Sequence, residues 1–144
     1  MSTYQISCQI GNTDPSAKLG LEIWIDNQQI FNSDHITEKT PLTFDVAEDE
    51  ADHELRFVMK NKTVAHTQID FSGNIVTDAR LTISDVAFDE IKLGQMFIDQ
   101  TQYTHDFNGS QPEITDRFYG EMGCNGTVSL QFTTPIYLWL LEHM

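Results

Sequence analysis

The chain has 144 residues, a length typical of one domain, and its 8 Lys and Arg against 22 Asp and Glu give a formal net charge of −14 at pH 7. This balance argues against nucleic acid and anionic membranes as partners, because both bind clustered basic side chains. Hydrophobic residues (40%) and aromatic residues (10%) are too frequent for a disordered chain. The sequence also has no long apolar run and no basic segment leading into one, so we expect neither membrane insertion nor a secretory signal.

Strand patterns fill the N-terminal half. Apolar and polar residues alternate, as in half-buried strands, over Tyr4–Ile10, Leu21–Asp26 with a short partner strand around Ile30, Leu42–Val46 and Glu54–Lys60. The block Asp45–Glu54 carries six acids and no Lys or Arg, which is typical of a solvated loop.

The C-terminal half continues the pattern with shorter runs. A hairpin is predicted where two strands flank Ser72-Gly73-Asn74, and a phase shift near Ser84-Asp85 predicts a β-bulge. The expected strands are Val64–Asp70, Ile75–Arg80, Leu81–Phe88, Tyr103–Phe107, Arg117–Glu121 and Val128–Phe132, followed by the apolar run Ile136–Leu141. No segment of ten or more residues has the period of a helix.

Many short strands separated by Gly, Asn and Pro turns predict an all-β protein. We expect an antiparallel, jelly-roll-like β-sandwich with a C-terminal β-hairpin or arm. Residues 1–144 are predicted to form a single domain, with 1–97 as the core sandwich and 98–144 as C-terminal hairpins and the apolar terminus.

Catalytic motifs are absent from the sequence. It contains no nucleophile elbow, phosphate-binding loop, dinucleotide fingerprint or zinc-protease helix motif, so we predict no enzyme and no catalytic residues. Cys8 and Cys124 are the only cysteines, and neither belongs to a Cys-x-x-Cys pair. Both are expected to be free thiols.

Clustered carboxylates raise the question of a metal site, because calcium prefers oxygen ligands. The acidic block Asp45–Glu54 lacks the Asp-x-Asp-x-Asp-Gly spacing that wraps one ion, which favours a solvated loop. Asp78, Asp85 and Asp89 are weak metal candidates that loops could bring together. We therefore expect no cofactor, with Ca²⁺ as the alternative.

Trp24 is a candidate contact residue. It occupies the polar phase of the strand on which Leu21, Ile23 and Ile25 share the apolar face. An outward tryptophan can stack on a sugar or anchor a protein contact. Alternatively, a second layer or another subunit covers that face.

The C-terminal run is a second candidate for a contact. Its aliphatic and aromatic side chains must be buried, either as a core strand of the sandwich or as an arm that docks into a neighbouring subunit. The residues predicted to dock on a partner are Ile136, Tyr137, Leu138, Trp139 and Leu141.

Four stretches of the chain resemble the calcium-dependent xylan-binding modules. They are Glu22–Ile30, Leu42–Val46, His53–Asn61 and Leu81–Val86, so the likeness covers about residues 20–95. The resemblance implies a jelly-roll-like sandwich and a carbohydrate-binding module.

A second resemblance, over about residues 20–144, is to small virion structural proteins of contractile-tailed marine phages, including those of cyanobacteria. The stretches that carry it are Asp52–Phe57, Ile83–Ile91, Tyr103–Gly109 and Phe118–Leu141. This resemblance implies a structural component present in many copies, without a chemical step.

The leading hypothesis is a non-enzymatic virion protein, either an exterior capsid decoration or a neck or tail accessory. Its expected partners are other virion proteins of the capsid, neck or tail. Its expected location is the host cytoplasm before assembly and the virion exterior afterwards. The alternative is a carbohydrate-binding module, calcium-dependent in one version, that contacts host glycans.

Overall fold

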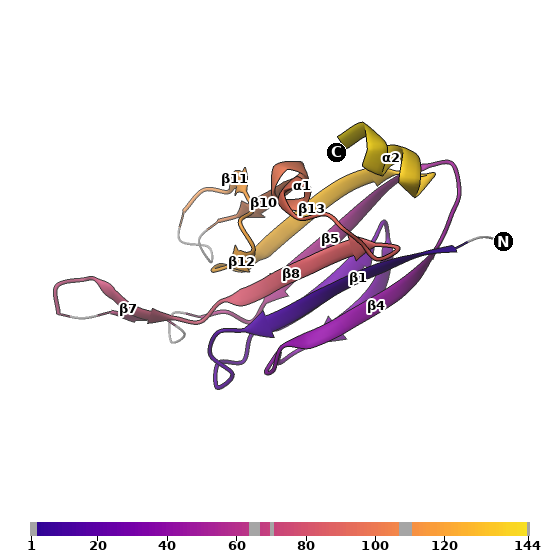
Figure 1. The fold of residues 1–144 in the computed structure, drawn as a ribbon. Coiled ribbons are helices and arrows are strands. Elements are labelled where there is room, and N and C mark those ends of the chain that lie inside the picture. The colour runs from indigo at the N-terminus through magenta and orange to yellow at the C-terminus, as the bar shows by residue number, and fades with distance from the viewer. Residues whose placement is uncertain (1–2, 64–66, 70, 107–110, 144) are drawn as a thin grey trace.

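Two antiparallel sheets pack face to face in the computed structural model, which describes residues 3–63, 67–69, 71–106 and 111–143 (Figure 1). Sheet A has the strand order β12-β8-β1-β4, and β9 pairs with β8 at one end. Its strands are β1 (Thr3–Asn12), β4 (Thr40–Ala47), β8 (Leu81–Phe88), β9 (Ile91–Lys92) and β12 (Glu121–Met122). The predicted β-sandwich is confirmed.

Sheet B has six strands in the order β11-β10-β13-β5-β2-β3. Its strands are β2 (Gly20–Ile25), β3 (Gln28–Ser33), β5 (Asp52–Lys60), β10 (Thr101–His105), β11 (Ile114–Arg117) and β13 (Gly126–Thr133). Strand β13 lies between β10 and β5 in this sheet. The segment after residue 97 is therefore part of the sandwich itself rather than an addition to a finished core.

A hairpin projects from one end of the sandwich (Figure 1). It consists of β6 (Thr67–Ile69) and β7 (Ile75–Asp78), which pair only with each other. Residues 64–66 and 70 of the predicted hairpin, and residues 107–110 after β10, lie outside the described residues.

The core lies between the two sheets and follows the predicted alternation of apolar residues. Phe88 of sheet A and Phe132 of sheet B meet with ring centroids 5.2 Å apart, and Tyr4 contacts both rings edge-on. The buried side chains of the central strands are Tyr4, Ile6, Cys8, Ile10, Leu21, Ile23, Ile25, Leu55, Phe57, Met59, Leu81, Ile83, Val86, Phe88, Val128, Leu130 and Phe132.

Cys8 and Cys124 are free, and burial raises the pKa of the Cys8 thiol to about 12.

Local irregularities fall partly where the sequence predicts them. The register between β1 and β8 shifts beside Ser84, and Asp85 has a φ of 53°, which confirms the bulge. The acidic block Asp45–Glu54 is only partly a loop, because its two ends belong to β4 and β5. A short helix not expected from the sequence, α1 (Gln95–Gln100), follows Gly94 and buries Phe97.

The predicted C-terminal strand is wrong, because Ile136–His143 forms the helix α2. Six consecutive apolar residues have no period, so the pattern does not distinguish a strand from a helix. The helical spacing places Ile136, Trp139 and Leu140 on one face, where all three are buried. The Glu48 carboxylate accepts the Ile136 N–H at 2.6 Å and so pairs one of the unbonded donors at the start of the helix.

The apolar face of α2 closes the core at one end of the sandwich. The Trp139 ring lies 5.8 Å from Phe88 and 6.2 Å from Phe132, measured between centroids. No helix among the described residues is long and apolar enough to cross a membrane.

This packing predicts opposite outcomes for two neighbouring substitutions in α2. Trp139→Ala should lower the free energy of unfolding by about 3–5 kcal/mol, because it removes a buried ring from the core. Leu138→Ala should change it by less than about 0.5 kcal/mol, because Leu138 is exposed. Urea denaturation of both variants checks the prediction, and equal effects would contradict the burial of one helix face.

Candidate functional site

Strand pairing builds a row of side chains across the outer face of sheet B. Directly opposed residues in antiparallel strands point to the same side of the sheet. Trp24 is opposite Gln29 and Arg56, Arg56 is opposite Ser129, and this row continues through Gln102 to Arg117. We call the outer surface around Trp24, Glu22, Gln29, Arg56 and Ser129 the Trp24 face. Trp24 is the aromatic member of the row, and its polar neighbours flank it on both sides.

Hydrogen bonds hold Trp24 in place on this face. Its Nε1 donates to a Glu22 carboxylate oxygen at 3.0 Å, and the Gln29 amide donates to the same oxygen at 2.9 Å. The Arg56 guanidinium carbon lies 5.6 Å from the centroid of the Trp24 ring, a cation–π distance. The Trp24 hydrogen bond is the largest of the effects that lower the pKa of Glu22, which therefore stays ionised as an acceptor.

A cleft of about 600 Å³ adjoins the Trp24 face where sheet B meets α2. Glu54 and Gln131 belong to the outer face of sheet B, and the Ser129 hydroxyl donates to the Glu54 carboxylate at 2.6 Å. The cleft is lined by Asp26, Asp52, His53, Glu54, Gln131, Phe132, Thr133, Trp139, Glu142 and His143. Most of its polar groups are hydrogen-bond acceptors, and four of them are carboxylates.

His53 stands between two carboxylates in the wall of this cleft. Its Nδ1 lies 2.7 Å from Asp26 Oδ2, and its Nε2 lies 2.7 Å from Asp49 Oδ1. A carboxylate beside each ring nitrogen favours the protonated ring, in which both nitrogens donate, and so raises the pKa of His53. The Asp26 carboxylate also accepts the Glu54 N–H at 2.9 Å, so this cluster ties the β2–β3 turn to the start of β5.

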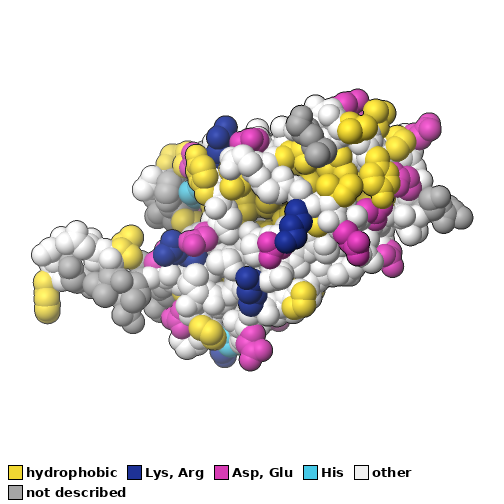
Figure 2. Space-filling model, viewed as in Figure 1, with side chains coloured by type: hydrophobic (Ala, Val, Ile, Leu, Met, Phe, Trp, Pro, Cys, Tyr) yellow, Lys and Arg dark blue, Asp and Glu magenta, His cyan; other side chains and the backbone are white. Residues whose placement is uncertain are grey.

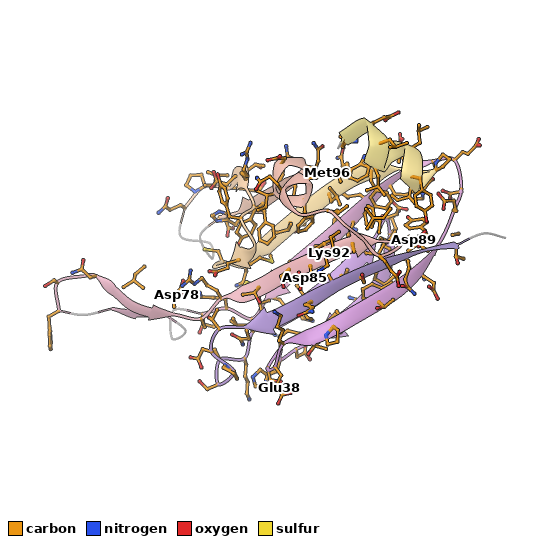
Figure 3. The ribbon with its side chains drawn as sticks, viewed as in Figure 1. Glu38, Asp78, Asp85, Asp89, Lys92 and Met96 are labelled. Atoms are coloured by element: carbon orange, nitrogen blue, oxygen red, sulfur yellow. The ribbon has the colours of Figure 1, made fainter. Side chains whose placement is uncertain are left out.

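The predicted metal ligands lie well apart (Figure 3): Asp78 ends β7, Asp85 lies within β8 and Asp89 follows the end of β8. The Asp78 carboxylate pairs with the Lys62 ammonium at the hairpin end. At the other end, Asp89 accepts the Gln5 N–H and the Tyr137 hydroxyl, each at 2.6 Å. The structure therefore does not bring these three carboxylates together.

The five predicted docking residues divide between core and surface. Ile136 and Trp139 belong to the chain's own core, whereas Tyr137, Leu138 and Leu141 are 50%, 56% and 73% exposed. Figure 2 shows hydrophobic side chains gathered around α2 with acidic side chains nearby. Only the exposed three are available to a partner.

No family model matches the chain, and no curated protein matches it. Among solved structures, the chain is similar to the selenomethionine form of vCBM60, with a TM-score of 0.55 and 11% identity over 88% of this chain and 89% of that one. That protein is described in connection with a circular permutation that links two families of calcium-dependent carbohydrate-binding modules. vCBM60 in complex with galactobiose is similar at a TM-score of 0.53 and 13% identity, over 88% of this chain and 96% of that one.

At this level of identity the similarity shows a shared β-sandwich fold. The neighbours also raise the question of calcium. Among the described residues no group of three or more His, Cys, Asp or Glu side chains can hold a metal ion. Asp26 and Asp49 are already bonded to the His53 ring, and Asp78 is paired with the Lys62 ammonium. The described carboxylates thus do not fit a calcium site built from three or more such side chains.

Sequence reasoning singled out Trp24 but missed His53, Arg56 and the cleft. Asp26 and His53 are 27 residues apart, and no local pattern marks them as partners. Only the structure shows that β2 pairs with β5, which places the Asp26 turn beside the start of β5.

The His53 cluster predicts that stability falls as pH rises above neutrality. Burial of the ring opposes protonation, but the hydrogen bonds to Asp26 and Asp49 outweigh it and raise the pKa of His53 above 6.5. A histidine whose pKa is higher in the folded than in the unfolded protein stabilises the fold, and this stabilisation is complete below the unfolded pKa, near 6.5. The stabilisation is lost as the pH rises through the folded pKa. Hydrogen bonds from His53 and Thr134 lower the pKa of Asp49, so its own contribution is lost only in acid, as pH falls through that lowered value.

Thermal unfolding measured between about pH 6 and pH 9 checks this prediction. The Tm of the native protein should decline over that range, and His53→Gln should flatten the decline. His35→Gln, at an exposed histidine, is the matched control and should leave it unchanged. A His53→Gln profile parallel to that of the native protein would contradict the assignment.

Proposed function

We propose that this protein is a non-catalytic carbohydrate-binding domain whose binding surface is the Trp24 face together with the adjoining cleft. The observation that carries the proposal is a single tryptophan held on a polar sheet face, in a sandwich of the fold that carbohydrate-binding modules use. One such neighbour is described in complex with galactobiose.

The chemistry of the Trp24 face suits a sugar. An indole ring offers a flat apolar surface to the C–H face of a pyranose ring, while neighbouring polar groups bond its hydroxyls. Glu22 and Gln29 supply acceptors, and Gln29 and Arg56 supply donors. Gln29 is bonded to Glu22, and Arg56 is held by the Asp26 carbonyl and the Trp24 ring, so these side chains lose little conformational entropy when a ligand binds.

The charge of the cleft indicates which glycans fit. Asp26, Asp52, Glu54 and Glu142 line it, and the whole chain carries −14. A uronic acid or a sialic acid would meet repulsion there, whereas the hydroxyls of a neutral oligosaccharide can donate to the carboxylates. We therefore infer a neutral glycan such as a galacto- or xylo-oligosaccharide.

Binding to a glycan array, followed by calorimetry on the best ligand, tests this function. Trp24→Ala should weaken binding by at least about 10-fold, as truncation of a central aromatic contact does. Tyr119→Ala is the matched control, because Tyr119 is an exposed aromatic residue outside the Trp24 face, and it should bind normally. Binding should persist in excess chelator, since no calcium step is assigned to the site. An array with no retained glycan would refute the function.

A second candidate function is docking on a larger assembly, as in a virion component. The observation that favours it is the exposed apolar surface of Tyr137, Leu138 and Leu141 on α2. Exposed apolar side chains that gather in one place are typical of contact surfaces. A phage capsid, neck or tail as the partner, and the virion exterior as the location, stay predictions from the sequence.

Charge substitutions on α2 test docking more cleanly than deletion of the C-terminus, because deletion would also remove Ile136, Trp139 and Leu140 from the core. The double variant Leu138→Asp/Leu141→Asp should fold normally and should lose incorporation into purified particles. Lys18→Met, at an exposed lysine, is the control for an unrelated surface change. Normal occupancy of the double variant would refute docking through α2.

A further inference from the structure

A buried ammonium group closes the base of the projecting β6–β7 hairpin. The Lys62 side chain is 1% exposed, and its Nζ donates to the Asp78 carboxylate and, at 2.5 Å, to the Ala79 carbonyl oxygen. Lys62 lies after β5 and before the hairpin, and Asp78, labelled in Figure 3, is the last residue of β7, so this contact joins the chain segments on the two sides of the hairpin. An ammonium group is buried this deeply only where a charge partner and hydrogen bonds offset the free energy of its lost hydration.

A third segment fixes the backbone of Lys62. The Asn125 side chain accepts the Lys62 N–H at 2.9 Å and donates to the Lys62 carbonyl at 2.9 Å. The neighbouring Cys124 N–H donates to the Tyr103 hydroxyl at 2.9 Å, which anchors that turn to β10. Three segments distant in the sequence therefore meet at Lys62: residues 78–79 bond its ammonium, and residues 124–125 bond its backbone.

The oxygen atoms that accept hydrogen bonds from the Lys62 ammonium are of the kind that hard metal ions bind. A carboxylate oxygen and a backbone carbonyl oxygen are typical calcium ligands. Here the positive charge is a compact ammonium with three donors, attached to the chain. It needs no ion from solution.

We propose that the Lys62 ammonium is the built-in cation of this sandwich and closes the hairpin base in place of a bound divalent ion, while the Lys62 backbone holds the β12–β13 turn. The structured protein then has no requirement for calcium, in contrast to the calcium dependence described for its structural neighbours. This inference concerns the stability of the free protein and does not rest on glycan binding.

Thermal unfolding of the full chain tests the proposal. The Tm of the native protein should be the same in excess EDTA and in millimolar calcium chloride. Lys62→Met should lower the Tm by about 10–20 °C, because it leaves the Asp78 carboxylate without its ammonium partner. The double variant Lys62→Met/Asp78→Leu should recover at least half of that loss, since apolar pairs replace buried ion pairs at little cost. Lys18→Met, at an exposed lysine, is the matched control and should change nothing.

Two results would overturn the proposal. The first is a native Tm that rises by several degrees in calcium or falls by as much in EDTA. The second is a Lys62→Met protein as stable as the native one. The chelator experiment uses the native protein alone, so it decides the question even if Lys62→Met does not fold. Loss or retention of glycan binding is measured separately and bears only on the proposed function.

Discussion

Carboxylates outnumber the basic side chains of this chain by 22 to 8, and the fold depends on where the few cations stand. Like charges that gather on a compact protein destabilise it. In the described structure three of these cations bridge or pair carboxylates from different segments. His53 stands between Asp26 and Asp49, Lys62 pairs with Asp78, and Lys60 with Glu22 and Asp34. These pairs join turns and strands that lie far apart in the sequence.

The same arrangement links stability to the proposed binding surface. Arg56 donates to the Asp26 carbonyl at 2.6 Å and lies beside the Trp24 ring, so the turn that His53 holds is also the edge of the Trp24 face. A surface already ordered by ion pairs and hydrogen bonds loses little freedom when a ligand binds. The protein's own cations already pair with Asp78, Glu22 and Asp34. The carbohydrate-binding fold of the neighbours and the lack of a fitting calcium site among the described residues are therefore compatible.

The helix α2 has a buried face and an exposed face, and both are apolar, so its sequence alone does not tell them apart. Its buried face, with Trp139 against Phe88 and Phe132, completes the core. Its exposed face carries Tyr137, Leu138 and Leu141. A strand would have placed Tyr137, Trp139 and Leu141 together on one side, whereas the helical spacing sends Trp139 inward and the other two outward. The exposed apolar surface of α2 is consequently smaller than the apolar run suggests.

The sequence by itself determined the fold class, the bounds of most strands, the bulge near Asp85 and the outward direction of Trp24. These follow from alternation and turn residues, which are local properties. Only the tertiary structure decided which side chains meet. The Trp24 row depends on the register of β2 with β5 and of β5 with β13, and the charges on His53 and Lys62 find partners in other segments. Register and ion pairing arise from packing between distant segments, and no local period encodes them.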